Sequence, residues 1–502
     1  MSAPLFRLNA DRKESLQCQL REQIARAIIE GHLPTGEALP SSRRLAKELG
    51  VARNTVMLAY DQLLDDGYLV ARERSGYFVN PDILAGRVAA TGADNHAAAR
   101  TAAAPELPWE SLLTRRLAQQ PCITKPTDWL DYDYPFLYGQ IDPNLFPTQH
   151  WRECSRDSVS VPAIRRWSAD HLSEDDPLLV EQIHQRLLPR RGVWARPEEI
   201  LVTVGAQQAL WISAMLTLGP QRRFAMENPG YVDMVNIART FTDDILAVDV
   251  DDQGLVIDDR LAGCHLAYVT PSHQSPTGVT LPLERRRQLL ERADHDNFLV
   301  IEDDYESETN FIDNPTPALK SLDTSGRVIY VGSLSKTLAP GLRLGYMVAP
   351  PAFIAEARAL RRLMLRHPAT NNQRSVALFL DRGYHDALLR QIRQTYQRRW
   401  HLMRDALEAH LPQFQIRSTF GGSCFWLEAP ESTDVGLLKR LAQEQGVLFE
   451  AGDVHFLTQP TRPTLRLGFS AIDESRIEAG IERLASLLPS LRQEASTPVH
   501  RG

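Results

Sequence analysis

Apolar residues near the start of the chain recur with the period of a helix. In the stretch SLQCQLREQIARAIIEGHL, four of them (Leu20, Ile24, Ala27 and Ile28) fall on one helical face. Gly31 follows where a helix would end. The pattern predicts an amphipathic helix with one buried face.

The next residues predict two more helices and a hairpin. Apolar positions favour a short helix over residues 42–49, a turn at Gly50 and a longer helix over residues 53–65, which is helix-turn-helix spacing. The segment GYLVARERSGYFV then alternates apolar residues on both sides of Ser75 and Gly76, as a β-hairpin does. That hairpin would be the wing of a winged helix, giving an α+β domain over residues 1–80.

The pattern changes twice more along the chain. Residues 81–127 are rich in Ala, Gly and Pro without a sustained period, which is typical of a linker. Across residues 128–488, apolar strand-like runs such as EILVTVGA, CHLAYVTP and NFLVIEDD alternate with amphipathic helical stretches, and residues 489–502 remain as a tail. Such alternation predicts an α/β domain with a mostly parallel sheet, whose ligands usually bind at the carboxyl ends of the strands.

Composition restricts the class of protein. The 502 residues are 43% hydrophobic and 24% charged, and no apolar run approaches the roughly 20 residues of a membrane span. The first residues lack the apolar segment of a secretory signal, so the cytoplasm is the expected location. A net charge of -7 means that any nucleic-acid site must be local.

The cysteines predict neither a disulfide framework nor a metal site. They are odd in number and show no CxxC spacing, so we expect reduced cysteines that serve in packing. The five are Cys18, Cys122, Cys154, Cys264 and Cys424.

The helix over residues 53–65 has the features of a DNA-recognition helix. Val56, Ala59, Tyr60 and Leu63 share one face that would be buried. Its other faces begin with Arg and Asn side chains, which can make bidentate contacts to guanine and adenine edges, while nearby basic residues could reach phosphates. The candidate DNA-binding residues are Arg43, Arg44, Lys47, Arg53, Asn54, Thr55, Arg72 and Arg74.

The charge of this module is small. Residues 1–80 hold 11 lysines and arginines against 10 aspartates and glutamates, a net charge of +1. Because phosphate contacts supply much of DNA affinity, we expect two modules to act together on paired half-sites, and therefore a homodimer. The segment LREQIARAIIEGHLPTGEALPSSRRLAKELGVARNTVMLAYDQLLDDGYLVARERSGYFV resembles the winged helix-turn-helix of GntR-type bacterial regulators.

The segment YVGSLSKTLAPGLRLGY carries a different chemistry. Pyridoxal phosphate needs an amine for a Schiff base, an anion site for its phosphate and a carboxylate facing its pyridine nitrogen. Lys336 could supply the amine if its site depresses the lysine pKa. Ser333, Ser335 and Arg343 could hold the phosphate, and Asp303 at a strand's carboxyl end could keep the pyridine nitrogen protonated.

Three further segments fit the same cofactor. Tyr305 could donate a hydrogen bond to the phenolic oxygen of the ring, and Tyr231 offers an aromatic face. A strand runs into a helix at Gly205, Ala206 and Gln207, where backbone amides attract phosphate.

These motifs resemble fold-type I pyridoxal phosphate enzymes, the aminotransferase fold. More narrowly, TPSHQSPTG, IEDDYESE and GSLSKTLAPGLRLGY are similar to MocR-type regulators, which join a GntR-like winged helix to an aminotransferase-like domain. The resemblance implies the cofactor roles given above, with Lys336 as the imine lysine. It also implies that Arg466, in TLRLGFS, recognises the carboxylate of an effector.

Two departures from the aminotransferase pattern concern the pocket. Ser275 precedes Pro-Thr-Gly where aminotransferases usually carry Asn, so Ser275 is expected beside the cofactor, and His273 or Gln274 could take the contact of that Asn. The segment 131–147 should line the substrate side, but its Gly139-Gln-Ile-Asp is a loose match to the usual Gly-x-Pro-Asp. The resemblance therefore assigns no effector.

Three functions stay open at this point. The first is a DNA-binding transcriptional regulator that holds pyridoxal 5'-phosphate as a Schiff base and senses an amino compound through external aldimine formation. The second is a pyridoxal phosphate-dependent aminotransferase with a winged-helix appendage, and residual transamination is compatible with both. In the third, the large domain has lost its cofactor and only dimerises, which the presence of Lys336, Asp303 and Arg343 disfavours.

Overall fold

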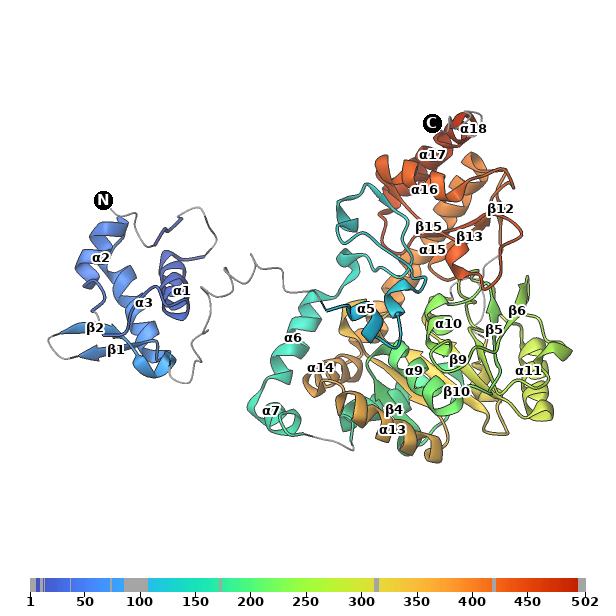
Figure 1. Ribbon diagram of the computed structural model, residues 1–502, viewed down its shortest axis with the longest axis horizontal. Helices are drawn as coiled ribbons and strands as arrows, with labels where there is room; N and C mark the ends of the chain where they lie inside the picture. The colour runs from blue at the N-terminus through green and yellow to red at the C-terminus, as the bar shows by residue number, and fades with distance from the viewer. Residues whose placement is uncertain are drawn as a thin grey trace. The chain divides into compact units, whose positions relative to one another are not determined.

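The computed structural model describes residues 6–9, 12, 14–36, 38–72, 75–84, 107–170, 174–310, 316–417 and 421–494. The chain divides into two compact units, Met1–Arg115 and Arg116–Gly502. Figure 1 shows the elements of both.

The first unit contains the predicted winged helix. Its elements are α1 (Leu16–Ile29), α2 (Ser42–Leu49), α3 (Arg53–Asp65) and a hairpin of β1 (Leu69–Arg72) and β2 (Gly76–Val79). The predicted helices over residues 42–49 and 53–65 and the hairpin are confirmed. The chain between α2 and α3 turns at Gly50, whose φ of 66° is a left-handed conformation that suits glycine.

The core of this unit explains why the helices form where the apolar pattern placed them. Leu20, Ile24 and Ile28 of α1 are fully buried against Val56 and Tyr60 of α3. The Tyr60 hydroxyl donates a hydrogen bond to the Pro40 carbonyl at 2.8 Å, which fixes α3 to the loop before α2. The polar faces of α2 and α3 remain exposed, as a recognition helix requires.

The second unit is built on an eight-stranded sheet. The strand order is β4-β11-β10-β9-β8-β5-β6-β7. The five central strands from β10 to β6 are parallel, whereas β4, β11 and β7 pair antiparallel with their neighbours, so the predicted mostly parallel sheet is confirmed. The bounds are β4 Ile200–Thr203, β5 Phe224–Asn228, β6 Ile245–Asp251, β7 Gly254–Leu255, β8 Leu266–Val269, β9 Leu299–Asp304, β10 Val328–Ser333 and β11 Gly345–Val348.

Both faces of this sheet are buried, since successive residues of a strand point to opposite sides. Tyr268 and Ile301 pack on one face with α9, α10 and α13. Ala267 and Val300, their neighbours in sequence, pack on the other face with α11 and α12. The sheet is therefore the middle layer of an α/β/α arrangement.

A second, antiparallel sheet was not predicted from the sequence. Its order is β12-β13-β16-β15, from β12 Gln415–Ile416, β13 Cys424–Glu428, β15 Glu450–Ala451 and β16 Thr464–Gly468. A small parallel pair joins β14 (Val447–Leu448) to β3 (Tyr134–Pro135). This pairing brings the chain just after the predicted linker to the C-terminal part of the unit.

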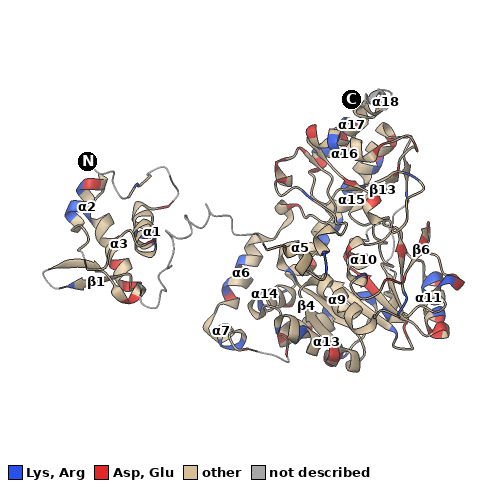
Figure 2. Cartoon of the chain, in the orientation of Figure 1, with Lys and Arg blue, Asp and Glu red and all other residues tan. Residues whose placement is uncertain are grey.

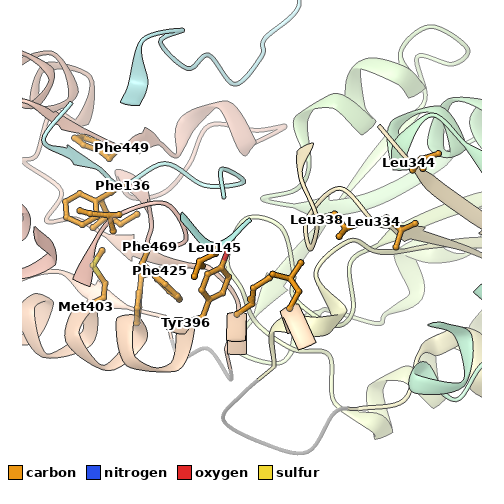
Figure 3. Packing of buried hydrophobic residues seen from close by; sticks show 14 of the residues in the cluster. Phe136, Leu145, Leu334, Leu338, Leu344, Tyr396, Met403, Phe425, Phe449 and Phe469 are labelled. Carbon is orange, nitrogen blue, oxygen red and sulfur yellow. The ribbon is translucent and has the colours of Figure 1, made fainter. Parts of the chain in front are cut away.

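Helices cover the sheets and share a large apolar core. Phe136, Phe425, Phe449, Phe469 and Met403 are buried together beside the long helix α15 (Figure 3). The helices of this unit are α6 Thr148–Ser158, α7 Val161–Trp167, α8 Pro177–Gln182, α9 Gly205–Thr217, α10 Val232–Ala238, α11 Leu283–Asp296, α12 Leu319–Leu322, α13 Pro351–Leu365, α14 Thr370–Asp381, α15 Tyr384–His410, α16 Val435–Glu444, α17 Ile477–Ser486 and α18 Leu488–Glu494. The short helix α5, Trp109–Leu112, falls within the first unit and buries none of its residues.

The described part of the chain bears on the predictions for cysteines, metal sites and membrane spans. All five cysteines are free; Cys154, Cys264 and Cys424 are buried as packing residues, but Cys122 is exposed and does not fit that prediction. Within the described ranges, no cluster of His, Cys, Asp and Glu could hold a metal ion. No helix among them is long and apolar enough to cross a membrane.

Gly468 lies where β16 of the antiparallel sheet packs on residues 136–138. Its amide donates to the Phe136 carbonyl at 3.0 Å, and a Cβ there would lie 2.5 Å from the Leu137 carbonyl group. Gly468→Ala must therefore separate β16 from residues 136–138. We expect the free energy of unfolding to fall by about 1–3 kcal/mol. Thermal unfolding followed by circular dichroism measures it.

The matched control is Gly219→Ala, because an added Cβ there meets nothing within 4 Å. The control should unfold close to the wild type. Equal midpoints for both variants would contradict the close packing of β16 on this segment.

Candidate functional site

A cavity of about 370 Å³ lies at the carboxyl ends of the central strands, where open α/β sheets usually bind ligands. Tyr268 lies near the end of β8, Asp303 near the end of β9, and Ser333 ends β10. The lining residues are Ile123, Tyr138, Gly139, Ala206, Gln207, Leu210, Tyr231, Asp233, Tyr268, Ser275, Asp303, Tyr305, Ser333, Ser335, Lys336, Pro340, Arg343 and Arg466. Every predicted cofactor residue except Gly205 is among them.

Lys336 points into this cavity from the turn that follows β10. Its Nζ lies 4.1 Å from the centre of the Tyr138 ring and 5.8 Å from that of Tyr305. Gly139 has a positive φ of 74°, which favours glycine, and a Cβ there would approach this Nζ to 2.7 Å and displace the amine. Burial lowers the pKa of Lys336 to about 8, although the nearby Glu306 carboxylate raises it. The amine is thus closer to its neutral, nucleophilic form than an ordinary lysine.

Asp303 is the carboxylate that faces the cavity. It accepts a hydrogen bond from the Tyr268 hydroxyl at 2.9 Å through Oδ2, while Oδ1 is buried without a partner among the described residues. Burial raises the pKa of Asp303 to about 7. A cationic N–H aimed at Oδ1 would satisfy this atom and restore a low pKa.

The adjacent acid, Asp304, has a structural role. It points to the other side of β9, where Arg191 donates to it at 2.7 Å and the Tyr330 hydroxyl at 2.8 Å. Alternation along the strand therefore separates a paired carboxylate from an available one.

An anion cradle lies at the start of α9. Arg343 has a positive φ of 49°, and its guanidinium would lie 3.0 Å from a Cβ at Gly205. Glycine at 205 thus lets the guanidinium approach the first backbone amides of α9, which attract anions. Ser335 Oγ is buried without a partner among the described residues, and Ser333 completes the cradle.

Two tyrosines are held by hydrogen bonds at the cavity wall. The Tyr231 hydroxyl donates to Gln207 Oε1 at 2.9 Å and also lies 3.2 Å from Asp233 Oδ2. The Tyr305 hydroxyl donates to the His273 carbonyl at 2.8 Å. A ring ligand would have to compete with that carbonyl for the Tyr305 hydroxyl.

Of the residues considered in place of the usual Asn, only Ser275 borders the cavity, and His273 and Gln274 do not. The Gln274 amide instead donates to the Pro229 carbonyl at 2.8 Å and to Glu227 at 3.2 Å. The chain just before the Pro-Thr-Gly motif is therefore used for packing.

Arg466 belongs to a buried cluster of charges. It faces Glu450 across the antiparallel β15/β16 pair, and its Nε donates to Glu450 Oε2 at 2.8 Å. The Arg466 guanidinium carbon lies 3.9 Å from the centre of the Tyr138 ring. Lys125 Nζ lies 3.4 Å from Glu450 Oε1 on the other side. Burial raises the pKa of Glu450, but Arg466 and then Lys125 outweigh burial, so it is lowered overall and Glu450 stays ionised.

Sequence reasoning missed several residues of the site. Tyr138 lies in the segment 131–147, where only a loose motif was recognised, yet its ring contacts both Lys336 and Arg466. Tyr268 could have been found, because it lies on a predicted strand next to that of Asp303. Glu450 and Lys125 carry no local signal, since their roles depend on pairing between distant segments.

The candidate DNA-binding residues lie on the first unit as expected, with one outside the described residues. Arg43, Arg44, Lys47, Arg53, Asn54 and Arg72 are exposed and Thr55 is half-buried, whereas Arg74 falls outside the residues described. Arg44 pairs with Glu48 at 2.8 Å, and Arg72 lies over the Phe78 ring at 4.4 Å. Figure 2 shows basic and acidic residues side by side on α2, in keeping with the small net charge.

The residues present fit pyridoxal phosphate. The cavity joins an amine with a depressed pKa, an available buried carboxylate and an anion cradle, and each needs a partner of the kind that this cofactor supplies. Lys336 would hold the aldehyde carbon, Asp303 the pyridine nitrogen, and Arg343 with Ser335 the phosphate.

Comparison with known families covers both units. The family "Bacterial regulatory proteins, gntR family" matches residues 16–79, and "Aminotransferase class I and II" matches residues 174–484. The HTH-type transcriptional regulator TauR of Rhodobacter capsulatus is 45% identical over 94% of this chain and 96% of that protein. The probable rhizopine catabolism regulatory protein MocR of Rhizobium meliloti is 31% identical over 98% of both.

A solved structure gives the same fold for the second unit. The α-aminoadipate aminotransferase LysN of Thermus thermophilus, complexed with N-(5'-phosphopyridoxyl)-L-leucine, matches with a TM-score of 0.69 and 27% identity. The match covers 77% of this chain and all of that one. In that solved structure the aminotransferase fold holds a phosphopyridoxyl ligand.

The depressed pKa of Lys336 predicts its reactivity. In cofactor-free protein, the extent of reductive methylation of Lys336 should increase with pH, with a midpoint near pH 8. Only the neutral amine reacts, and ordinary lysines deprotonate at about pH 10.4. Mass spectrometry of the Lys336 peptide across a pH series measures the midpoint.

Glu306→Gln supplies the matched change. Since the Glu306 charge raises the pKa of Lys336, its removal should move the midpoint to lower pH. A wild-type midpoint at the pH of surface lysines would contradict the buried environment described here.

Proposed function

The chain belongs to the MocR-type transcriptional regulators, which join a GntR-type winged helix to an aminotransferase-like domain, and we propose that it senses an amino compound through pyridoxal phosphate and adjusts its binding to DNA accordingly. The observation that carries the proposal is the meeting of Lys336, Asp303 and Arg343 in one cavity of a chain that also presents a recognition helix.

Each of these residues has a separate task when the cofactor is bound. Pyridoxal phosphate supplies an aldehyde that condenses with primary amines. Lys336 would hold the cofactor through its amine, and its lowered pKa favours the neutral form that such a bond requires. Asp303 would keep a proton on the pyridine nitrogen, and Arg343 would neutralise the phosphate.

The effector contributes an amine and an acidic group. Its amine would compete with the Lys336 amine, which lies beside Tyr138, for the aldehyde that the cofactor would supply. Its acidic group binds Arg466, which lines the same cavity. The Lys336 amine and the Arg466 guanidinium carbon lie 4.1 Å and 3.9 Å from the centre of the same Tyr138 ring, so both cationic groups contact one side chain of the cavity wall.

DNA binding belongs to the first unit. Arg53, Asn54 and Thr55 at the start of α3 would read base edges, and Arg43 and Lys47 would contact phosphates. With a net charge of only +1 over residues 1–80, a homodimer on two half-sites in the cytoplasm is the arrangement that gives useful affinity.

Transamination is the second candidate, because the cavity contains the parts that imine chemistry needs and the fold is that of aminotransferases. Incubation with amino acids and a keto acid separates the two. Repeated turnover supports an enzyme, whereas one spectral change without turnover supports a sensor.

Loss of the Lys336 amine tests the sensor directly. Purified wild-type protein should absorb in the near-visible range of a protonated imine, and Lys336→Ala should lose this band together with the effect of amino acids on DNA binding. Lys439→Ala, a change to a lysine on α16, is the control and should keep both. Retention of effector-dependent DNA binding in Lys336→Ala would sink the proposal.

Arg53 tests the recognition helix. Arg53→Ala should weaken binding of the protein to the promoter of its own gene by about 1–3 kcal/mol, because a bidentate base contact is lost. The preference for this promoter over unrelated DNA should fall as well. Arg26→Ala, on α1, should change binding little. Gel-shift titrations at fixed salt give both affinities, and a drop confined to Arg26→Ala would show that α3 is not the reading helix.

A further inference from the structure

Three charged side chains, two basic and one acidic, form a cluster next to the cavity. Glu450 lies between Arg466 and Lys125, bonded to Arg466 Nε at 2.8 Å and with Lys125 Nζ at 3.4 Å. The side chains of Arg466 and Glu450 are 1% and 4% exposed, and that of Lys125 is 22% exposed. Two cations thus share one carboxylate in a largely buried place, so neither has Glu450 to itself, and an anion bound to Arg466 would supply a second partner.

Only Arg466 of the three faces the cavity. Arg466 is a lining residue, whereas Lys125 lies beside Gly139, with its Nζ 3.6 Å from where a Cβ of that residue would be. Lys125 also donates to the Tyr138 carbonyl. An anion in the cavity would contact Arg466, whereas Lys125 would act on it through space and through its interaction with Glu450.

Lys125 comes from an unexpected part of the chain. It lies within residues 81–127, the predicted linker, on the segment that leads from the winged helix into the second unit. This segment also contacts Asn236 of α10, whose Nδ2 donates to the Pro121 carbonyl at 2.7 Å and whose carbonyl accepts from Gln120 Nε2 at 3.5 Å. Between these anchors, Ile123 lines the cavity. The segment is therefore part of the wall of the site.

We propose that Lys125 is a positioning residue for recognition of the acidic group of the effector: by sharing Glu450, it keeps Arg466 available for an anion, and it couples the occupied site to the segment that leads to the winged helix. This inference rests on the proposed function, because it presumes an effector that binds Arg466.

The coupling follows from the sharing of one carboxylate. Without an effector, Glu450 divides its interaction between Arg466 and Lys125. An acidic group on Arg466 takes over part of that interaction, so Glu450 becomes more available to Lys125. The effector thus strengthens the contact of residues 116–127 with Glu450 in the same unit. The amide of the same amino acid lacks the acidic group and does not.

The experiment uses the full-length protein with its cofactor and a set of defined probes. These are glycine, 3-aminopropanoate, 4-aminobutanoate and 5-aminopentanoate, each compared with its own amide. Dissociation constants come from the change in cofactor absorbance, and the acid-to-amide ratio of each pair measures recognition of the anion. Amide hydrogen exchange of residues 116–127, with and without each probe, measures how firmly this segment is held against the rest of the unit.

Two variants change the cluster in opposite directions. Lys125→Met removes one cation and should lower the acid-to-amide preference of the best probe by about tenfold or more, while Lys125→Arg should keep most of it. Glu450→Gln leaves both cations without a carboxylate and should raise the preference. In the wild type the acid should slow exchange in residues 116–127, and both Lys125→Met and Glu450→Gln should lose this response.

Each outcome decides the matter. An unchanged preference in Lys125→Met, or a wild type that prefers no acid over its amide, would overturn the role of Lys125. An equal loss for acids and amides would show a merely structural residue and would also overturn it. Failure of the proposed function looks different, because the wild type would then show no imine absorbance at all. If Lys125→Met does not bind cofactor, the opposite change expected of Glu450→Gln still tests the cluster.

Discussion

The removal of the Lys336 amine from water is the constraint on which the site depends. An ammonium in a buried place is costly unless it is paired, and here Glu306 is opposed by the charges of Lys125 and Arg466. The pKa of this lysine therefore falls into the range where it can form and release an imine near neutral pH. The positive charges that lower the pKa of Lys336 also make this part of the cavity favourable for an anionic ligand. The chemistry at Lys336 and the recognition at Arg466 therefore arise from one electrostatic arrangement.

The fold produces this arrangement by bringing strand ends together. Parallel pairing places Asp303 opposite Val331, only a few residues before Lys336, so the acid and the amine must lie at one edge of the sheet. Glycines then permit close approach: Gly139 leaves room for the amine and Gly205 for the Arg343 guanidinium. The second sheet adds Arg466 from the far end of the chain, and its packing on residues 136–138 carries Tyr138 to the place where both cations contact its ring.

Much of this was accessible from the sequence, and the reason differs from part to part. The helices of the first unit follow from local periodicity, and Lys336, Asp303 and Arg343 lie on short motifs at strand ends. The small antiparallel sheet was missed because its strands are short and lie far apart in the chain. Glu450 and Lys125 were missed for the same reason, since nothing near them indicates that β15 pairs with β16 or that the supposed linker enters the site. Cys122, expected to pack, is exposed and belongs to that same segment.

The account makes the cofactor the input and DNA affinity the output of one equilibrium, as linkage requires. The most direct measurement records cofactor absorbance and DNA binding on the same sample while the preferred amino acid is added. The account predicts that both signals change together, with the same midpoint. A change in DNA affinity without a spectral change, or a complete spectral change that leaves DNA affinity untouched, would contradict it.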